Sequence, residues 1–204
     1  RKSQPVTDTF NSWRPPFGNG VGKLSDFLMQ TWPNYQRLKS RRPLSSFIHL
    51  IGNSDLTNGL FEEKLSSSMI CLEAIKSYWA IDEGHIHGLS EDPRGWFKNA
   101  AGRKVDFEQL LKLTLAAVQM QIPRSFTEIK RLRNAMIHRG FIRETDDVTR
   151  FIFGAVQPKT LHLRMFAIME RVHDLLREYM LRLLGYKGDY WAYSQSGMRK
   201  KTVC

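Results

Sequence analysis

The chain has 204 residues, of which 42% are hydrophobic and 25% are charged. This composition is typical of globular proteins and excludes a disordered chain, and no apolar run approaches the ~18 residues that a membrane-spanning helix needs. The balance of 31 Lys and Arg against 20 Asp and Glu gives a net charge of +11. This surplus favours a polyanionic partner, RNA or DNA before an acidic membrane surface.

The first residues and the two cysteines indicate the setting of the chain. The sequence starts Arg1-Lys2-Ser3, with neither an initiator Met nor the hydrophobic segment of a secretory signal. Cys71 lies within an apolar helical pattern and Cys204 is the last residue, which argues against a disulfide framework or a cysteine-rich zinc site. We therefore expect a fragment of a longer protein that works in a reducing cytoplasm.

The N-terminal quarter is predicted to pass from irregular structure into two helices. Residues 1–23 contain three prolines and three glycines and are predicted to be an irregular segment or linker. Residues 24–40 have helical spacing that is broken or kinked at Pro33. Pro43 suits the first position of a helix over residues 44–51, and residues 52–55, Gly-Asn-Ser-Asp, are typical of a turn.

The strongest helical periodicity covers residues 60–81. Apolar or small residues recur there at alternating spacings of four and three, the seam of a helix in a bundle. These residues are Phe61, Leu65, Ser68, Leu72, Ile75 and Trp79. A second apolar side comprises Ile70, Ala74, Tyr78 and Ile81, so we expect this helix to be central.

Three more helices are predicted in the second half, over residues 105–122, from Ser125 or Thr127 to about Arg139, and over residues 160–184. Pro123 ends the first, and Gly140 and Gly185 end the others. Residues 82–104 form a long polar connection, and residues 185–204 are an aromatic and basic tail. Residues 141–158 are ambiguous, because Phe151-Ile152-Phe153 could be a short strand or a packed loop.

These elements predict an all-α fold. The sequence has no internal repeat and no alternating pattern long enough for a sheet. We expect an up-and-down helical bundle over residues 24–184, between the irregular segment 1–23 and the basic tail 185–204.

Several groups of polar residues do not meet the requirements of a site. Residues 18–23, Gly-Asn-Gly-Val-Gly-Lys, lack the first glycine and the final hydroxyl of a phosphate-binding loop and are predicted to be a flexible linker. Glu83, His85 and His87 supply too few ligands for zinc and are predicted to lie in an exposed loop. No metal and no cofactor is expected. The remaining groups are predicted to lie on helix surfaces: His49, His162 and His173, and a salt-bridged arginine series of Arg164, Arg171, Arg177 and Arg182.

Residues 131–140 bring an arginine, an amide and an imidazole together near a helix end. Ile129, Leu132 and Met136 share the stripe that faces the core, and Arg133 lies on its apolar shoulder. A guanidinium there must be paired or placed at an interface. Asn134 and His138 are four residues apart and share one face, with Arg131 close to it.

These residue types suit phosphodiester chemistry. An imidazole can transfer a proton near neutral pH, and a guanidinium can hold the non-bridging phosphate oxygens as charge builds. Asn134 could orient either group, and the 2′-hydroxyl of RNA is a built-in nucleophile, so no metal is required. The alternative is structural: Arg133 pairs with a carboxylate such as Glu73, and His138 merely ends its helix.

The motif Arg133-Asn134-Ala135-Met136-Ile137-His138 resembles the signature of HEPN domains, an arginine followed by four to six residues and a histidine. Residues 70–74 on the long preceding helix, and the helix that leads through Leu132 into the motif, resemble ApeA-type HEPN domains of bacterial antiphage proteins. The resemblance covers residues 24–184.

The resemblance implies a bundle that forms a homodimer in which the two motifs share one cleft. Such domains are metal-independent endoribonucleases that leave a 2′,3′-cyclic phosphate and a 5′-hydroxyl. By position, the resemblance implies that Arg133 holds the phosphate, His138 transfers protons and Asn134 is a supporting polar residue. Arg131 is the rival candidate for the arginine, and Glu73 is a further supporting residue. An inactive HEPN module that only dimerises and binds RNA or nucleotide is the alternative.

The implied setting is antiviral defence by abortive infection. We expect a toxin-like effector in the cytoplasm, controlled by an upstream sensor domain of the same longer chain and not bound to a membrane. Gly140 stands where nucleotidyltransferase-regulated HEPN toxins have Tyr, so that regulation is not expected. The RNA partner would be transfer RNA or phage or host transcripts, bound in part by Arg139, Arg199, Lys200 and Lys201.

Overall fold

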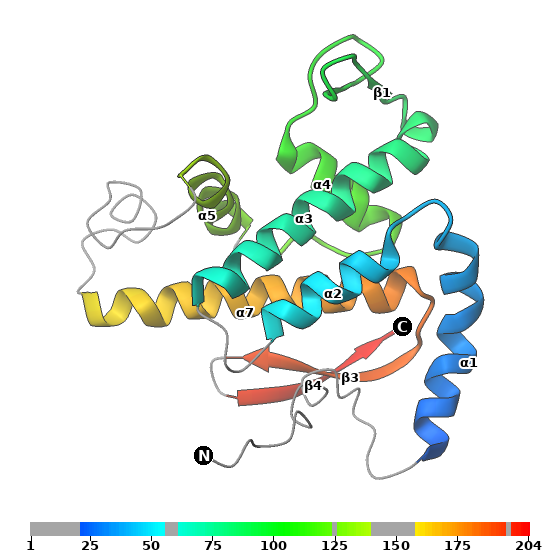
Figure 1. Cartoon of the computed structure of the whole chain (residues 1–204), viewed down its shortest axis with the longest axis vertical. Coiled ribbons are helices and arrows are strands. Elements are labelled where there is room, and N and C mark those ends of the chain that lie inside the picture. The colour runs from blue at the N-terminus through cyan, green and yellow to red at the C-terminus, as the bar shows by residue number, and fades with distance from the viewer. Residues whose placement is uncertain (1–20, 56–60, 124–125, 140–157, 195–196) are drawn as a thin grey trace, which may run out of the picture.

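The computed structural model describes residues 21–55, 61–123, 126–139, 158–194 and 197–204. This part of the chain contains six α-helices, a short 3₁₀ helix η2 (Gly84–His87) and two antiparallel hairpins (Figure 1). The helices are α1 (Val21–Leu38), α2 (Leu44–Asp55), α3 (Phe61–Glu83), α4 (Phe107–Ala117), α5 (Phe126–Arg139) and α7 (Pro158–Leu183). The hairpins are β1 (Ser90–Glu91) with β2 (Phe97–Lys98), and β3 (Gly188–Ser194) with β4 (Gly197–Val203).

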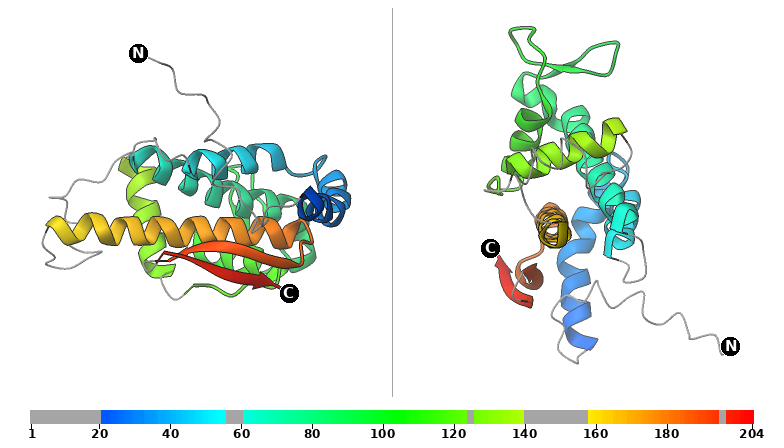
Figure 2. Two further views of the ribbon diagram at one scale, coloured as in Figure 1. Left: turned by 90° about the horizontal axis from the view of Figure 1, so that it is seen from below. Right: turned by 90° about the vertical axis from the view of Figure 1, so that its left-hand side faces the viewer.

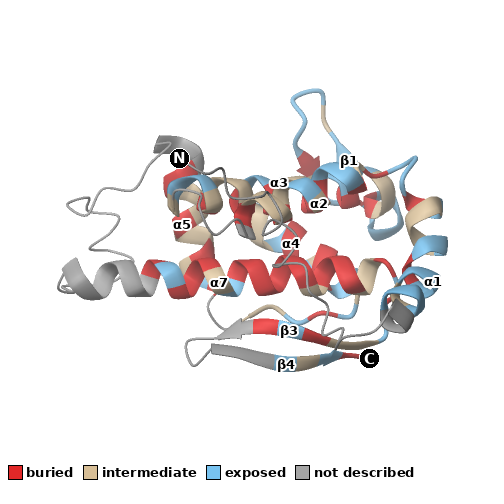
Figure 3. Cartoon of the chain, turned by 60° about the horizontal axis from the view of Figure 1, so that its bottom comes forward, coloured by how far each residue is buried: buried red, intermediate tan, exposed pale blue. Residues whose placement is uncertain are grey.

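Helix α7 runs through the middle of the fold. Helices α2, α3 and α5 lie on one side of it and the β3–β4 hairpin on the other, while α1 and α5 cross it steeply (Figures 1 and 2). Most of the described part of α7 is buried (Figure 3). The main core joins α2, α3, α4, α5 and α7 through side chains such as Phe47, Leu72, Leu111, Ile129 and Tyr179.

The predicted seam of α3 is confirmed, because Leu65, Ser68, Leu72, Ile75 and Trp79 are all buried. The second apolar side is not packed in the same way: Ile70, Tyr78 and Ile81 are 39–57% exposed. Helix α3 therefore packs mainly through the seam, and most of its second apolar side faces outward.

Two local predictions near the N-terminus are wrong: a break of the first helix at Pro33 and a turn over residues 52–55. Helix α1 continues through Pro33 without a break, although an internal proline costs about 3 kcal/mol, because Leu38 and Tyr35 pack against the core. Residues 52–55 continue α2 and do not form a turn. Burial of Ile51 and of Ser54, whose hydroxyl donates to the Ile51 carbonyl at 2.7 Å, favours the helix there.

Helix α4 is shorter than the predicted helix over residues 105–122. Asp106 caps its start by accepting a 2.8 Å hydrogen bond from the Gln109 amide. Its end comes at Ala117, and Gln119 adopts a φ of 58°, which a helix does not allow. By contrast, Gly185 adopts a φ of 75° and ends α7 as predicted. Ser125, Gly140, residues 1–20 and residues 141–157 lie outside the described residues.

The all-α prediction is correct only for the larger part of the described chain, because the predicted tail contains a hairpin. Strands β3 and β4 pair from Gly188 with Val203 to Ser194 with Gly197. Tyr190, Ala192 and Val203 are buried against α7 and the turn after it, which explains why this tail is ordered. A shorter pair, Ser90 with Lys98 and Glu91 with Phe97, lies within the predicted connection 82–104. Among the described helices, none combines the length and apolar composition needed to cross a bilayer.

Candidate functional site

Helix α5 places the predicted motif across α3 and α7. Ile129, Leu132 and Met136 are buried as the periodicity predicts, which leaves Arg133 and Asn134 half-buried beside them. The backbone of His138 continues the helix one turn beyond Asn134. The side chains of His138 and Arg139 lie outside the described part of the structure.

Arg133 is held by groups from three helices. Its Nε donates to Glu73 Oε1 on α3 at 2.5 Å, and its Nη1 donates to Asn134 Oδ1 at 2.7 Å. Its Cζ lies 4.8 Å from the ring centroid of Phe107 on α4, within the range of a cation–π contact. The side chain of Arg133 is 17% exposed, so this guanidinium is fixed but still reachable from solvent.

Glu73 binds a second cation at the same place. Its other oxygen, Oε2, lies 2.9 Å from the Nζ of Lys76, one turn further along α3. Lys76 also donates to Ser77 Oγ at 3.2 Å and lies 5.8 Å from the Phe107 ring centroid. Two cations thus share one carboxylate, and the cluster of Arg133, Lys76 and Glu73 carries a net formal charge of +1.

The arrangement leaves part of Arg133 unused. A guanidinium has five N–H donors, and the contacts with Glu73 and Asn134 use two of them. No described residue accepts from the other three. The site can therefore hold an anion at the remaining N–H groups of Arg133, two of which are on Nη2, while Glu73 and Asn134 fix its orientation.

The Glu73–Arg133 pair is the one that the structural alternative predicts, and its presence is confirmed. Arg131, the rival arginine, is also half-buried on α5, but the described contacts of Glu73 and Asn134 go to Arg133. Of the two arginines, Arg133 is the one that contacts Glu73 and Asn134.

A second ion-pair group joins α5 to α4 next to this cluster. Lys130 Nζ lies 3.1 Å from Glu108 Oε2, and this hydrogen bond raises the pKa of Lys130. A hydrogen bond from Lys112, followed by the one from Lys130, holds the pKa of Glu108 below its usual value. The Lys130–Glu108 contact joins the two helices and helps to keep Phe107 of α4 beside Arg133.

The predicted RNA-binding lysines lie elsewhere. Lys200 and Lys201 belong to β4, on the side of α7 opposite α5 (Figures 1 and 2). Lys200 Nζ lies 2.5 Å from Asp189 Oδ2, and Lys201 Nζ lies 3.9 Å from carboxylate oxygens of Asp174 and Glu178. The structure therefore does not bring these lysines to Arg133, and the Arg199 side chain lies outside the described residues.

The minor candidates do not form a second site of the kind considered from the sequence. Glu83 is occupied by Arg42 and Trp79, and the His87 ring packs against Trp79 with centroids 5.3 Å apart. The described residues contain no group of three or more metal-ligating side chains. His173, predicted on a helix surface, is instead buried in α7.

The arginine series on α7 is partly confirmed. Arg171 pairs with Glu128 and Arg182 with Glu178, whereas Arg177 is buried. Residues 18–20 and the Arg164 and His162 side chains lie outside the described part.

Sequence reasoning missed two members of the cluster, Lys76 and Phe107. Lys76 follows Glu73 by three residues on one helix, a spacing that could have suggested the pair. Phe107 comes from a separate helix, and no local pattern points to its contact with Arg133.

Comparison of the chain with known protein families, with curated proteins and with solved structures finds no match in any of the three.

Proposed function

We propose that the chain is a metal-independent cytoplasmic endoribonuclease module of a defence protein, with a composite site formed by two copies. The observation that carries this proposal is the half-buried Arg133, fixed at Nε by Glu73 and at Nη1 by Asn134, with three N–H groups that no described residue binds. The helix that carries it reaches His138 one turn beyond Asn134.

The proposed reaction needs only these groups and the RNA. The 2′-hydroxyl gives its proton to one imidazole and attacks the adjacent phosphorus, and the bond from phosphorus to the 5′-oxygen breaks. The leaving oxygen takes a proton from a second imidazole, so the products are a 2′,3′-cyclic phosphate and a 5′-hydroxyl. One His138 from each copy would supply the base and the acid, while the free N–H donors of Arg133 stabilise the charged phosphate.

A second function is favoured by one specific contact. Glu73 accepts a hydrogen bond from the Nε–H of Arg133. This N–H is one of the two donors in one type of bidentate contact between arginine and phosphate. A module that binds RNA or nucleotide as a dimer without cutting it would tolerate this partial neutralisation more easily than a nuclease would.

The deciding experiment is incubation of the purified chain with total RNA in EDTA, followed by analysis of the RNA ends. We expect cleavage that persists in EDTA, leaves cyclic phosphates and stops when the 2′-hydroxyl at the cut site is methylated. His138→Ala should abolish cleavage and keep the fold and the dimer, because His138 lies off the core stripe. Lys112→Ala, at a half-exposed position of α4, is the matched control.

Each function makes a different prediction for this experiment. If His138→Ala cuts RNA at the wild-type rate, or if cleavage requires added Mg²⁺, the ribonuclease proposal is wrong. RNA binding without any cleavage by the dimeric wild type would support the non-catalytic module.

A further inference from the structure

A cavity of about 480 Å³ opens where the ends of several elements meet, away from Arg133. Its walls come from the ends of α1, α3, α4 and α7, the turn after α7 and the end of β4. Arg182 of its lining follows Arg171, which pairs with Glu128 of α5, by eleven positions along α7. At 1.5 Å per residue this places the cavity about 16 Å further along α7.

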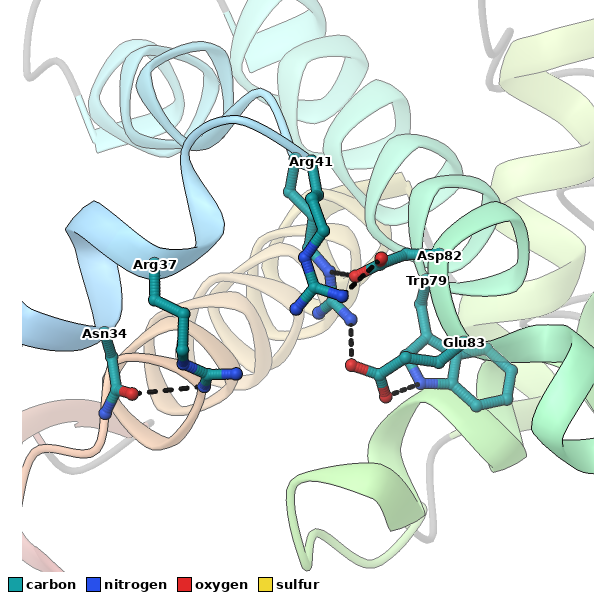
Figure 4. Close-up of polar contacts among 7 residues, drawn as sticks. Asn34, Arg37, Arg41, Trp79, Asp82 and Glu83 are labelled. Atoms are coloured by element: carbon teal, nitrogen blue, oxygen red, sulfur yellow. Dashed lines mark hydrogen bonds and ion pairs between the residues drawn. The ribbon is translucent and has the colours of Figure 1, made fainter.

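The charged side chains around this cavity are mostly basic. Arg37, Arg42, Arg182 and Lys187 line it, against Glu83 as the acidic side chain of the lining. In Figure 4, Arg37 extends from α1 toward the space that Trp79 and Glu83 border from α3. The formal charge of these five side chains is +3.

Glu83 does not offset the other cations. Its Oε1 accepts from Arg42 at 2.5 Å and its Oε2 accepts from the Trp79 indole at 3.1 Å (Figure 4). Arg42, which is 2% exposed, is also bound to Asp82 Oδ2 at 2.9 Å. This group forms one wall of the cavity, and the contacts of its two carboxylates go to Arg41, Arg42 and Trp79, not to Arg37 or Lys187.

The other three cations keep donors for a ligand. Arg37 gives one N–H to Asn34 Oδ1 at 3.1 Å, and Arg182 gives its Nε–H to Glu178 at 3.0 Å. The remaining N–H groups of both guanidiniums have no acceptor among the described residues, and the same holds for the Lys187 ammonium. Glu178 offsets the charge of Arg182, whereas no carboxylate of the described residues pairs with Arg37 or Lys187, so a bound anion would balance these two cations.

The other walls suit the body of a small organic molecule. Val118, Leu183 and the Tyr186 ring contribute some apolar surface, whereas Leu38, Trp79 and Val203 are at most 2% exposed and lie behind it. Polar groups make up most of the lining, and the volume lies within the range of about 300–1,000 Å³ of small-molecule sites. A phosphate joined to a small body with hydrogen-bonding groups of its own, such as a sugar, matches this lining.

We propose that this cavity binds a small organic phosphate of about mononucleotide size, with the phosphate held by Arg37, Arg182 and Lys187. This inference is independent of the ribonuclease proposal. The competing explanation is that the cations only stabilise the C-terminal ends of α1 and α7, where basic side chains interact favourably with the helix dipole.

Cys204 provides a direct test, because it lines the cavity and is exposed. The other cysteine, Cys71, is fully buried, and burial raises the pKa of its thiol to about 12, so it will not react in the folded chain. The rate of Cys204 alkylation by the neutral reagent iodoacetamide is measured with adenosine 5′-monophosphate, ribose 5-phosphate or adenosine. Sodium chloride keeps the ionic strength constant.

We expect both phosphates, but not adenosine, to slow alkylation of Cys204 and to raise the melting temperature. The double variant Arg37→Ala/Lys187→Ala should weaken this response by roughly tenfold or more. Both positions are exposed, so this variant should keep its fold. The control Lys39→Ala/Lys112→Ala removes the same charge at exposed positions outside the lining and should respond like the wild type.

Three results would overturn the proposal. One is protection by neither phosphate, and the second is equal protection by adenosine. The third is an unchanged phosphate response in the Arg37→Ala/Lys187→Ala variant. If that variant only melts at a lower temperature, with the response intact, the cations serve the helix ends.

Discussion

Replacement of Glu73 by Gln should cost the fold about 2 kcal/mol. The carboxylate is 23% exposed, and the side chains of its partners Arg133 and Lys76 are 17% and 10% exposed. Removing one member of a fully buried pair costs about 3–5 kcal/mol, whereas exposed pairs contribute about 0–1 kcal/mol. The Glu73 pairs lie between these limits, and the neutral amide would leave two neighbouring cations without a counter-charge.

For a chain of this length, a loss of about 2 kcal/mol corresponds to a fall in melting temperature of about 4–8 °C. The measurement is urea unfolding followed by far-ultraviolet circular dichroism, with the midpoint compared at an unchanged slope. A double-mutant cycle with Arg133→Met should show a coupling of about 1–2 kcal/mol between the two positions. Lys112→Met, which breaks a more exposed pair with Glu108, should leave the midpoint nearly unchanged.

If Glu73→Gln unfolds at the wild-type midpoint, Glu73 does not stabilise this cluster. If the cycle shows no coupling, the contact between Glu73 and Arg133 contributes nothing to folding. In both cases Glu73 could not be the group that positions the guanidinium for phosphate.

Three further predictions concern Gly185, Cys71 and the two lysines of β4. Gly185→Ala should destabilise the chain by about 1–3 kcal/mol in thermal unfolding, because φ is 75° and the new methyl group would collide with the Asn34 side chain of α1. The control Gly102→Ala has a φ of 73° but open space around it, so it should cost less. The folded chain keeps the Cys71 proton up to a pKa of about 12, whereas the unfolded thiol loses it near pH 8.5. The free energy of unfolding should therefore fall between these values by up to about 1.4 kcal/mol per pH unit, and Cys71→Ala should lack this part of the slope. Neutralising Lys200 and Lys201 should lower RNA affinity by less than about tenfold, because both lysines already pair with carboxylates. The slope of log affinity against log salt concentration should fall by at most about 0.7 per residue. An unchanged slope would show that the two lysines do not contact RNA.

The helices were predictable where one apolar face repeats over several turns. The seam of α3 and the core stripe of α5 both follow directly from spacing, and both are buried. Residues 52–55 were predicted as a turn but continue a helix. Their turn-forming composition is a local preference, and burial of Ile51 and Ser54 outweighs it. Such tertiary contacts are not visible in a short window of sequence.

The β3–β4 hairpin was missed for a related reason. Tyr190 and Ala192 alternate with exposed Trp191 as a half-buried strand should, but the partner strand reads Met198-Arg199-Lys200-Lys201 and shows no apolar alternation. Pairing with β3 and burial of Val203 define that strand. The cavity was equally unpredictable, because its lining comes from positions between Asn34 and Cys204.

The candidate site combines a predictable half with an unpredictable one. The position of Arg133 on the apolar shoulder of α5 required a partner, and Glu73 is that partner. A purely structural pair would be complete at this point, with one carboxylate for one guanidinium. Lys76 adds a second cation to the same carboxylate, which a structural role for Arg133 does not require and which leaves the cluster with an unbalanced positive charge. A phosphate of RNA would balance that charge at the remaining N–H groups of Arg133. This excess charge is the physical reason to test the site as an RNA-cleaving centre before treating it as a buried ion pair.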